Sequence, residues 1–163
     1  MKLSKIARAY EDVWLDDPEE NPDSPHWRVP FDDASIETYL AKVSSAIDRA
    51  RDNERMAREA ATDEERRAAN EAQARLIKRT VAAFIGTEGW DEMLRWLGGG
   101  EAVDPADYIR VLGEVFAAFL DMLGRYCTSA QLRACGMRYE READRAREAG
   151  RRKGKKKRKG GGR

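Results

Sequence analysis

The sequence predicts a mainly α-helical fold with a small N-terminal β-hairpin, an α+β helical bundle that contains one charged helical hairpin. Three observations predict it: a period-two alternation early in the chain, apolar residues spaced by three and four further on, and helix-capping sequences between them. The boundaries that we expect are a hairpin segment at 1–33, a charged helical region at 34–85, C-terminal helices at 86–148 and a disordered basic tail at 149–163.

The hairpin is predicted from two short runs rich in β-forming residues, 10–15 and 26–31. In the second run Trp27, Val29 and Phe31 alternate with polar residues, which is typical of a strand with one buried face. The acidic, proline-rich stretch between the runs is predicted to be a loop. Because an isolated hairpin is marginally stable in water, we expect it to pack on a helix.

The region 34–85 is predicted to be helical and rich in alanine and charge. Asp33 is the expected N-cap of a first helix, whose apolar stripe is Ile36, Leu40, Val43 and Ile47, widened by Tyr39. Thr62 and Glu65 form a capping-box sequence, so a second helix is expected to start there and to stop at Gly86. Two helices joined at Thr62 would form the two arms of an antiparallel helical hairpin, which is the structure that we predict. A single long helix is the alternative.

The C-terminal helices have clearer apolar faces. A short helix over 87–97 is expected to end at three successive glycines, and Asp104 and Pro105 are expected to open the core helix, which runs to Leu123. The apolar face of that helix is Tyr108, Leu112, Val115, Phe116, Phe119, Leu120 and Leu123. A further helix is predicted to start at a second capping box, at Thr128.

The formal net charge of +1 hides a division of charge along the chain. Residues 149–163 carry nine Lys or Arg and no acid, so the rest of the chain carries +1 − 9 = −8. Without apolar residues the tail is expected to be disordered. It would bind polyanions nonspecifically, because no aromatic residue is interleaved for base stacking. The cations concerned are Lys153, Lys155, Lys156, Lys157, Arg158 and Lys159.

No motif indicates an enzyme. The chain has one histidine, His26, and its two cysteines, Cys127 and Cys135, are too far apart for a CxxC pair. No nucleotide fingerprint or nucleophile elbow occurs, so we expect no catalytic residue, no metal and no cofactor. No apolar run is long enough for a bilayer and no signal peptide is recognisable, which predicts a cytoplasmic location.

The order of short motifs resembles a known family. The stretch 27–33 leads into 36–40, and after the charged helices come 86–94, with its Gly-Thr-Glu-Gly-Trp run, the glycines 98–100 and the helix that Asp104 opens. Over residues 9–125 this order is similar to that of the tail assembly chaperones of phages with long, flexible tails. The alanine-, arginine- and glutamate-rich stretch 48–75 departs from the family pattern and would be an insertion.

The resemblance implies a non-catalytic protein of the bacterial host cytoplasm, absent from the mature virion. It would coat the tape measure protein and recruit tail tube subunits during tail assembly. Such chaperones are often extended by ribosomal frameshifting, for which the codons of the run 154–157 are a candidate site.

The expected partner-binding residues are Trp90, Met93, Leu94 and Leu97, on the short helix beside the charged arms. Two alternatives remain open at this point. One is a nucleic-acid-associated accessory protein that uses the basic tail. The other is a helical scaffolding subunit that forms homo-oligomers.

Overall fold

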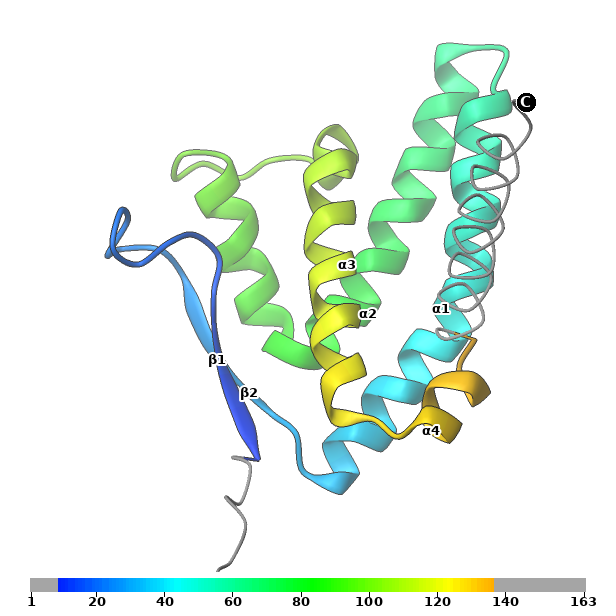
Figure 1. Cartoon of the computed structure of the whole chain (residues 1–163). Coiled ribbons are helices and arrows are strands. Elements are labelled where there is room, and N and C mark those ends of the chain that lie inside the picture. The colour runs from blue at the N-terminus through cyan, green and yellow to red at the C-terminus, as the bar shows by residue number, and fades with distance from the viewer. Residues whose placement is uncertain (1–8, 137–163) are drawn as a thin grey trace, which may run out of the picture. The chain divides into compact units, whose positions relative to one another are not determined.

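The computed structural model describes residues 9–136, which fall into two units divided after Cys127 (Figure 1). The predicted mainly helical fold with an N-terminal hairpin is confirmed. The first unit contains strands β1 (Tyr10–Trp14) and β2 (His26–Pro30), helices α1 (Asp33–Glu59) and α2 (Asp63–Leu97), the 3₁₀ helix η1 (Pro105–Tyr108) and helix α3 (Ile109–Tyr126). The second unit contains helix α4 (Ser129–Ala134).

The two strands pair antiparallel, with Tyr10 opposite Pro30 and Trp14 opposite His26. The predicted alternation is confirmed, because Val29 and Phe31 are buried and Trp27 is half-buried, whereas the polar positions and Pro30 are exposed. Strand β2 packs on α2, where the indole Nε1 of Trp27 donates to the carboxylate of Glu92 at 3.2 Å. The hairpin is therefore held by a helix, as its small size requires.

Helix α1 begins one residue earlier than the sequence pattern suggested. Asp32, not Asp33, is the N-cap: its backbone is extended and its carboxylate accepts hydrogen bonds from the backbone N–H and the hydroxyl of Ser35, at 3.0 and 2.8 Å. These two bonds lower the pKa of Asp32. Asp33 is already helical and adds negative charge to the first turn, where the helix dipole favours it.

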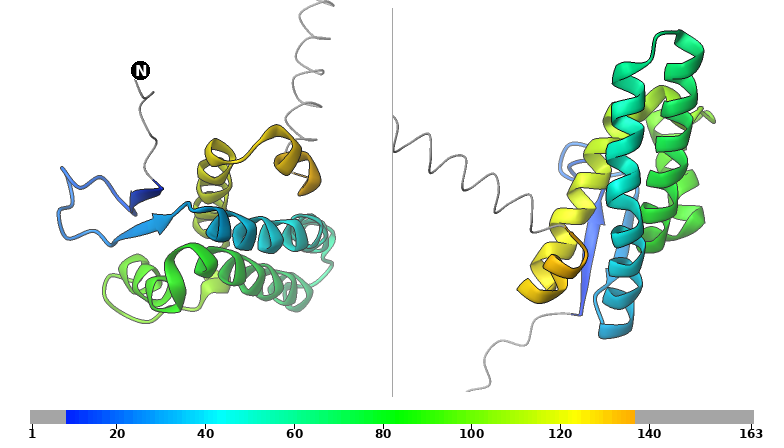
Figure 2. Two further views of the ribbon diagram at one scale, coloured as in Figure 1. Left: turned by 90° about the horizontal axis from the view of Figure 1, so that it is seen from below. Right: turned by 90° about the vertical axis from the view of Figure 1, so that its right-hand side faces the viewer.

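Helices α1 and α2 run side by side as an antiparallel hairpin, which confirms that prediction over the single long helix (Figure 2). The turn is built by the predicted capping box. The Thr62 hydroxyl accepts from Glu65 N at 3.1 Å, and the Glu65 carboxylate accepts from the backbone N–H groups of Ala61 and Thr62. Since both helix ends at this turn are exposed, the capping groups satisfy donors that would otherwise bond only to water.

Helix α2 is broken at Gly86, where the sequence predicted a stop. Gly86 has φ of 79° and ψ of 167°, a conformation that other residues adopt at a cost. The chain turns sharply there, so that the part before Gly86 lies along α1 and the part after it lies on the side of the β-hairpin (Figures 1 and 2). Gly89 follows in this second part, and a Cβ atom there would lie 2.9 Å from the Trp27 Nε1, so the close approach of the hairpin requires glycine.

The predicted core helix from Asp104 is divided into η1 and α3. Asp104 is the N-cap that the sequence indicated, and its carboxylate accepts from Ala106 N at 2.9 Å, but the turn that follows is 3₁₀ and the α-helix starts only at Ile109. Arg67 of α2 bonds the carboxylates of both Asp104 and Asp107, at 2.5 and 2.8 Å. The hydrogen bond to Asp107 is the main cause of a raised pKa of Arg67.

Aromatic rings join the elements in the core of the first unit. Tyr39 stacks on Phe84, with ring centroids 4.1 Å apart, and Phe84 contacts Phe119 at 4.9 Å. Phe31 stacks on Tyr126 at 3.9 Å and meets Tyr39 edge-on. The strand end, α1, α2 and α3 thus share one chain of ring contacts.

Two predicted apolar faces are corrected by the burial pattern. In α1 the predicted Leu40 and Ile47 are only half-buried, and the buried stripe is instead Ile36, Tyr39, Val43, Ala46 and Ala50. The small alanines face α2 because they let the two helices approach closely. In α3, Phe116 is half-buried against Ala46, Ala50 and Leu76, while the fully or largely buried residues are Leu112, Phe119, Met122 and Leu123.

The second unit is described only over its first residues. Thr128 caps α4, accepting from Gln131 N at 3.2 Å in the predicted capping box. The basic tail and the expected helical stretch before it lie outside the described residues. Within residues 9–136, no helix combines the length and the hydropathy that crossing a bilayer requires.

Candidate protein-binding groove

The residues that the sequence singled out for partner binding lie mostly in the interior. Trp90 and Met93 have no exposed surface, Leu94 is buried and Leu97 is half-buried. The break at Gly86 brings this part of α2 against β2, so its apolar side packs inward. In this conformation Trp90 and Met93 are not accessible to a partner. A docking surface must therefore consist of other residues.

The basic tail was the second expected site. Its residues Lys153, Lys155, Lys156, Lys157, Arg158 and Lys159 all lie outside the part of the chain that the structure describes. Polyanion binding through them stays a prediction of the sequence.

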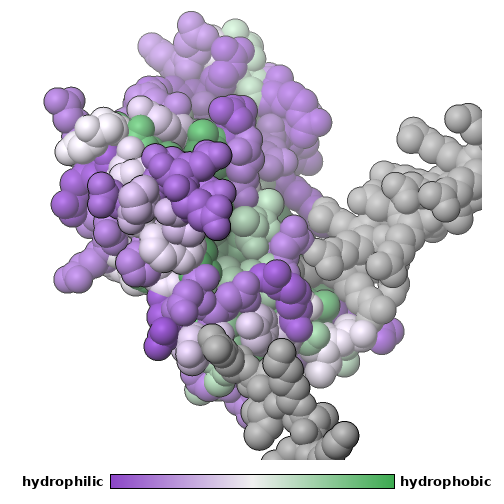
Figure 3. Space-filling model, turned by 60° about the vertical axis from the view of Figure 1, so that its left-hand side comes forward, coloured by the Kyte–Doolittle hydropathy of each residue, from purple (hydrophilic) through white to green (hydrophobic). Residues whose placement is uncertain are grey.

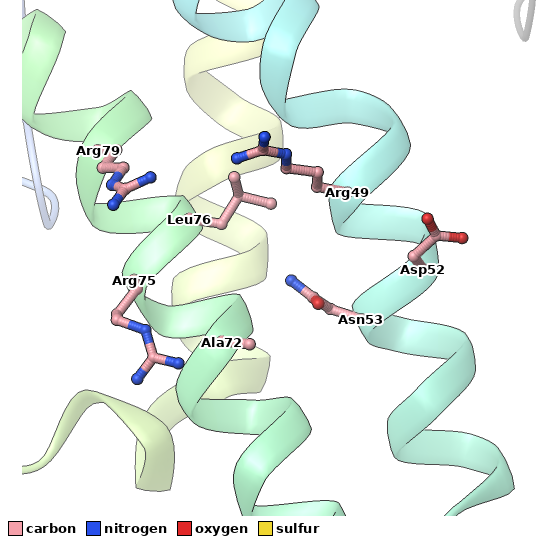
Figure 4. A pocket seen from close by; sticks show the side chains of 7 residues that line it. All are labelled: Arg49, Asp52, Asn53, Ala72, Arg75, Leu76 and Arg79. Carbon is pink, nitrogen blue, oxygen red and sulfur yellow. The ribbon is translucent and has the colours of Figure 1, made fainter.

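A groove of about 310 Å³ opens between the two helical arms (Figure 4). Its lining residues come from one face of α1 and one face of α2: Arg49, Asp52, Asn53, Ala72, Arg75, Leu76 and Arg79. Figure 4 shows Arg49 reaching from α1 towards Leu76, while the Asp52 carboxylate turns away from the gap.

The groove follows from helical spacing. On α1 the lining residues recur at 49, 52 and 53, and on α2 at 72, 75, 76 and 79, so each set lies on one side of its helix. Ala72 has the smallest side chain of the set and leaves space between the arms, and Leu76 forms an apolar floor. Behind the gap, Asn53 donates to Gln73 at 3.1 Å and links the two arms.

The charge of the groove is unbalanced. Arg49, Arg75 and Arg79 form no ion pair with any residue between 9 and 136, whereas most other described arginines pair with a carboxylate. The only carboxylate in the lining is Asp52, which already binds Arg55 at 3.1 Å. Three guanidinium groups therefore surround an apolar floor without a partner from the described chain.

Met56 extends this surface towards the tip of the arm. It lies three and four residues beyond Asn53 and Asp52, which places it on the same side of α1, and it is 56% exposed. A methionine adapts its shape to different apolar partners. The surface formed by the groove and Met56 is called the arginine groove below.

A second pocket, of about 670 Å³, lies where the hairpin loop meets the end of α2. It is lined by Trp96, which is half-buried, and by Asp23, Pro25, Glu92, Arg95, Gly99 and Gly100. Its acids outnumber its single arginine, so no one type of ligand charge is favoured. Figure 3 shows that the face over the hairpin and the end of α2 carries mostly hydrophilic side chains, with hydrophobic ones confined to small areas.

The single histidine and the possible metal ligands are the other groups of interest. His26 stacks on Trp14 at 4.2 Å between ring centroids, at the surface of the hairpin. Residues 9–136 contain no group of three or more His, Cys, Asp or Glu side chains that could hold a metal ion. The arginine groove offers fixed cations and apolar contacts, which suit a noncovalent complex with an anionic surface.

No protein-family model, no curated protein and no solved structure matches this chain. The family resemblance in the order of its motifs therefore stays a hypothesis.

Part of the arginine groove gives a signal in the sequence. Arg75 and Arg79 are four residues apart around Leu76, and no acid stands three or four residues away from Arg79. Arg49 and Arg75 give no such signal, because Asp52 and Glu71 stand at ion-pair spacing from them. Only the structure shows that these acids pair with Arg55 and Arg67 instead.

Proposed function

We propose that this protein is a non-catalytic chaperone of phage tail assembly, which binds the tape measure protein and recruits tail tube subunits. The observation that carries the proposal is the arginine groove, an unpaired cationic and apolar surface on a long pair of helical arms. A surface of this kind binds a helical client without chemistry.

Two further features support a chaperone. The order of the hairpin, the charged arms, the Gly-Thr-Glu-Gly-Trp run and the following helix is the order that resembles the tail assembly chaperones. The groove is also small, so one copy would bind weakly. Many copies along one long client would bind together through avidity and still be released as the tube forms.

The proposal predicts that co-expression with the tape measure protein of the same phage keeps that client soluble and yields a co-purifying complex. The chain truncated after Ala149 is the matched variant, since it removes the basic tail and keeps the groove. We expect the truncated chain to retain the client. The measurement is the soluble fraction of the tape measure protein, with and without each form.

A nucleic-acid accessory protein is the second candidate, because both the tail and the groove are cationic. This candidate predicts the opposite result for the full chain and the truncated chain. The full chain would retard DNA in a gel, the truncated chain would lose that activity, and neither would bind the tape measure or tube protein. That outcome would contradict the chaperone proposal.

A further inference from the structure

We propose that the arginine groove recognises an acidic amphipathic helix, with carboxylates one turn apart on either side of an apolar residue. This inference rests on the protein-binding function proposed above and defines the chemistry of the partner. Within the described chain, the groove is set apart by the combination of three unpaired arginines with an apolar floor.

The spacing of the groove matches two turns of a helix. The segments from Arg49 to Met56 and from Ala72 to Arg79 are eight residues each, so their first and last residues are about 10.5 Å apart at 1.5 Å per residue. Arg75 and Arg79 are one turn apart, as are two glutamates at positions i and i+4 of a partner helix. Such a pair could meet both guanidinium groups while Arg49 approaches from the opposite arm.

The floor selects for an amphipathic partner. Leu76 and Ala72 lie between the arginines, and the exposed Met56 continues the apolar surface towards the arm tip. A leucine between the two glutamates of the partner would lie over this floor and lose its contact with water. Burial of that kind stabilises the complex by roughly 25 cal/mol per Å² of apolar area.

The same features argue against a nucleic-acid strand as the occupant. No aromatic side chain lines the groove, so bases would have nothing to stack on. Asp48, whose side chain is 90% exposed, and Asp52 flank Arg49 on α1, so the cationic surface is interrupted there by acids. A helix with separate carboxylates can avoid these acids, whereas a polyphosphate chain cannot.

The test uses a labelled peptide of about 20 residues built from Ala and Leu with Glu pairs at i and i+4, a length that forms a stable helix. Its matched control has Gln in place of every Glu. Measured by fluorescence anisotropy, the affinity of the full chain for the Glu peptide should be at least about tenfold higher than its affinity for the Gln peptide. The difference should shrink as the salt concentration rises from about 0.05 to 0.5 M.

The variant Arg75→Gln/Arg79→Gln should lose about tenfold or more in affinity for the Glu peptide. Both arginines lack ion pairs in the described chain and glutamine has a similar helix propensity, so circular dichroism should be unchanged. Arg58→Gln is the control, because Arg58 lies nine residues from Arg49 and hence on the opposite side of α1. It should bind the Glu peptide like the unmodified chain.

Three results would overturn the inference: equal affinity for the Glu and Gln peptides, an equal loss with Arg58→Gln, or tighter binding of single-stranded DNA that depends on Arg75 and Arg79. The outcome is separable from that of the proposed function. If the tape measure protein is kept soluble but the Glu peptide is not bound, the chaperone proposal stands and the groove assignment fails. If the Glu peptide is bound but the tape measure protein is not kept soluble, the groove assignment stands and the chaperone proposal fails.

Discussion

Tyr39 is the residue that ties the β-hairpin to the helices. Its hydroxyl donates to the backbone carbonyl of Pro30 at 2.9 Å, and its ring contacts both Phe31 and Phe84. Burial raises the pKa of Tyr39, since an ionised phenol would lose its hydration. The side chain therefore contributes a neutral hydrogen bond as well as apolar packing.

Tyr39→Phe should lower the free energy of unfolding by about 1–2 kcal/mol at neutral pH, because the Pro30 carbonyl loses its donor. Above about pH 10 the unfolded chain releases the Tyr39 proton before the folded chain does, so this contribution falls as pH rises. The gap between the free energies of unfolding of the two proteins, measured in urea, should thus stay constant up to about pH 9 and narrow above about pH 10. A gap that stays constant or widens would contradict a raised pKa of Tyr39.

At the scale of single elements, glycine positions decide where helices break. Gly86 has a positive φ at the bend of α2, and Gly113 lies inside α3 with open space around the position of a Cβ atom. The same substitution should consequently have opposite effects at the two sites.

Gly86→Ala should destabilise the protein by about 1–2 kcal/mol, because a Cβ atom makes the left-handed conformation costly. Gly113→Ala should stabilise it by about 0.5–1 kcal/mol, since alanine loses less backbone entropy in a helix. Thermal unfolding of both variants beside the unmodified chain measures the difference. A stabilising Gly86→Ala would show that α2 runs straight through this position.

The sequence predicts features that depend on neighbouring residues, whereas features that depend on tertiary packing could not be predicted from it. The capping box at Thr62 and the alternation at 27–31 depend on neighbours in the chain, and both predictions are confirmed. The sequence predicts the N-cap of α1 one residue late, because Asp32 and Asp33 have the same side chain and only the backbone conformation shows which of them is the cap. The 3₁₀ start before Ile109 carries no composition signal, since Asp104 and Pro105 open either type of helix.

The candidate site likewise has features that the sequence predicts and features that only the tertiary structure shows. An apolar face of Trp90, Met93 and Leu94 suggested a docking surface, but a periodic stripe does not show whether the protein itself or a partner covers it. The break at Gly86 decides this by turning the stripe inward. The arginine groove needs two segments, 49–56 and 72–79, that lie on different helices, and only the antiparallel pairing of α1 and α2 brings Arg49 to Arg79.

In the first unit as a whole, helices α1 and α2 are packed into the aromatic core at their base, whereas the turn at their tip is exposed. Near the base, α1 and α2 share the aromatic contacts with Phe31 and Phe119. Towards the tip, α2 is joined to η1 by Arg67, and residues 61–68 are exposed throughout. The arginine groove lies between these regions, on helices that the core holds in place. A preformed groove spares a weak complex the cost of ordering its own binding surface.

Amide hydrogen exchange, with and without the tape measure protein, tests the central claim most directly. Binding of a helical client to the arginine groove should slow exchange in the segments 49–56 and 72–79. The β-hairpin at 10–30 should exchange at its original rate and serves as the internal reference. Slower exchange confined to the basic tail, or slower exchange in the hairpin with none in the arms, would contradict the account.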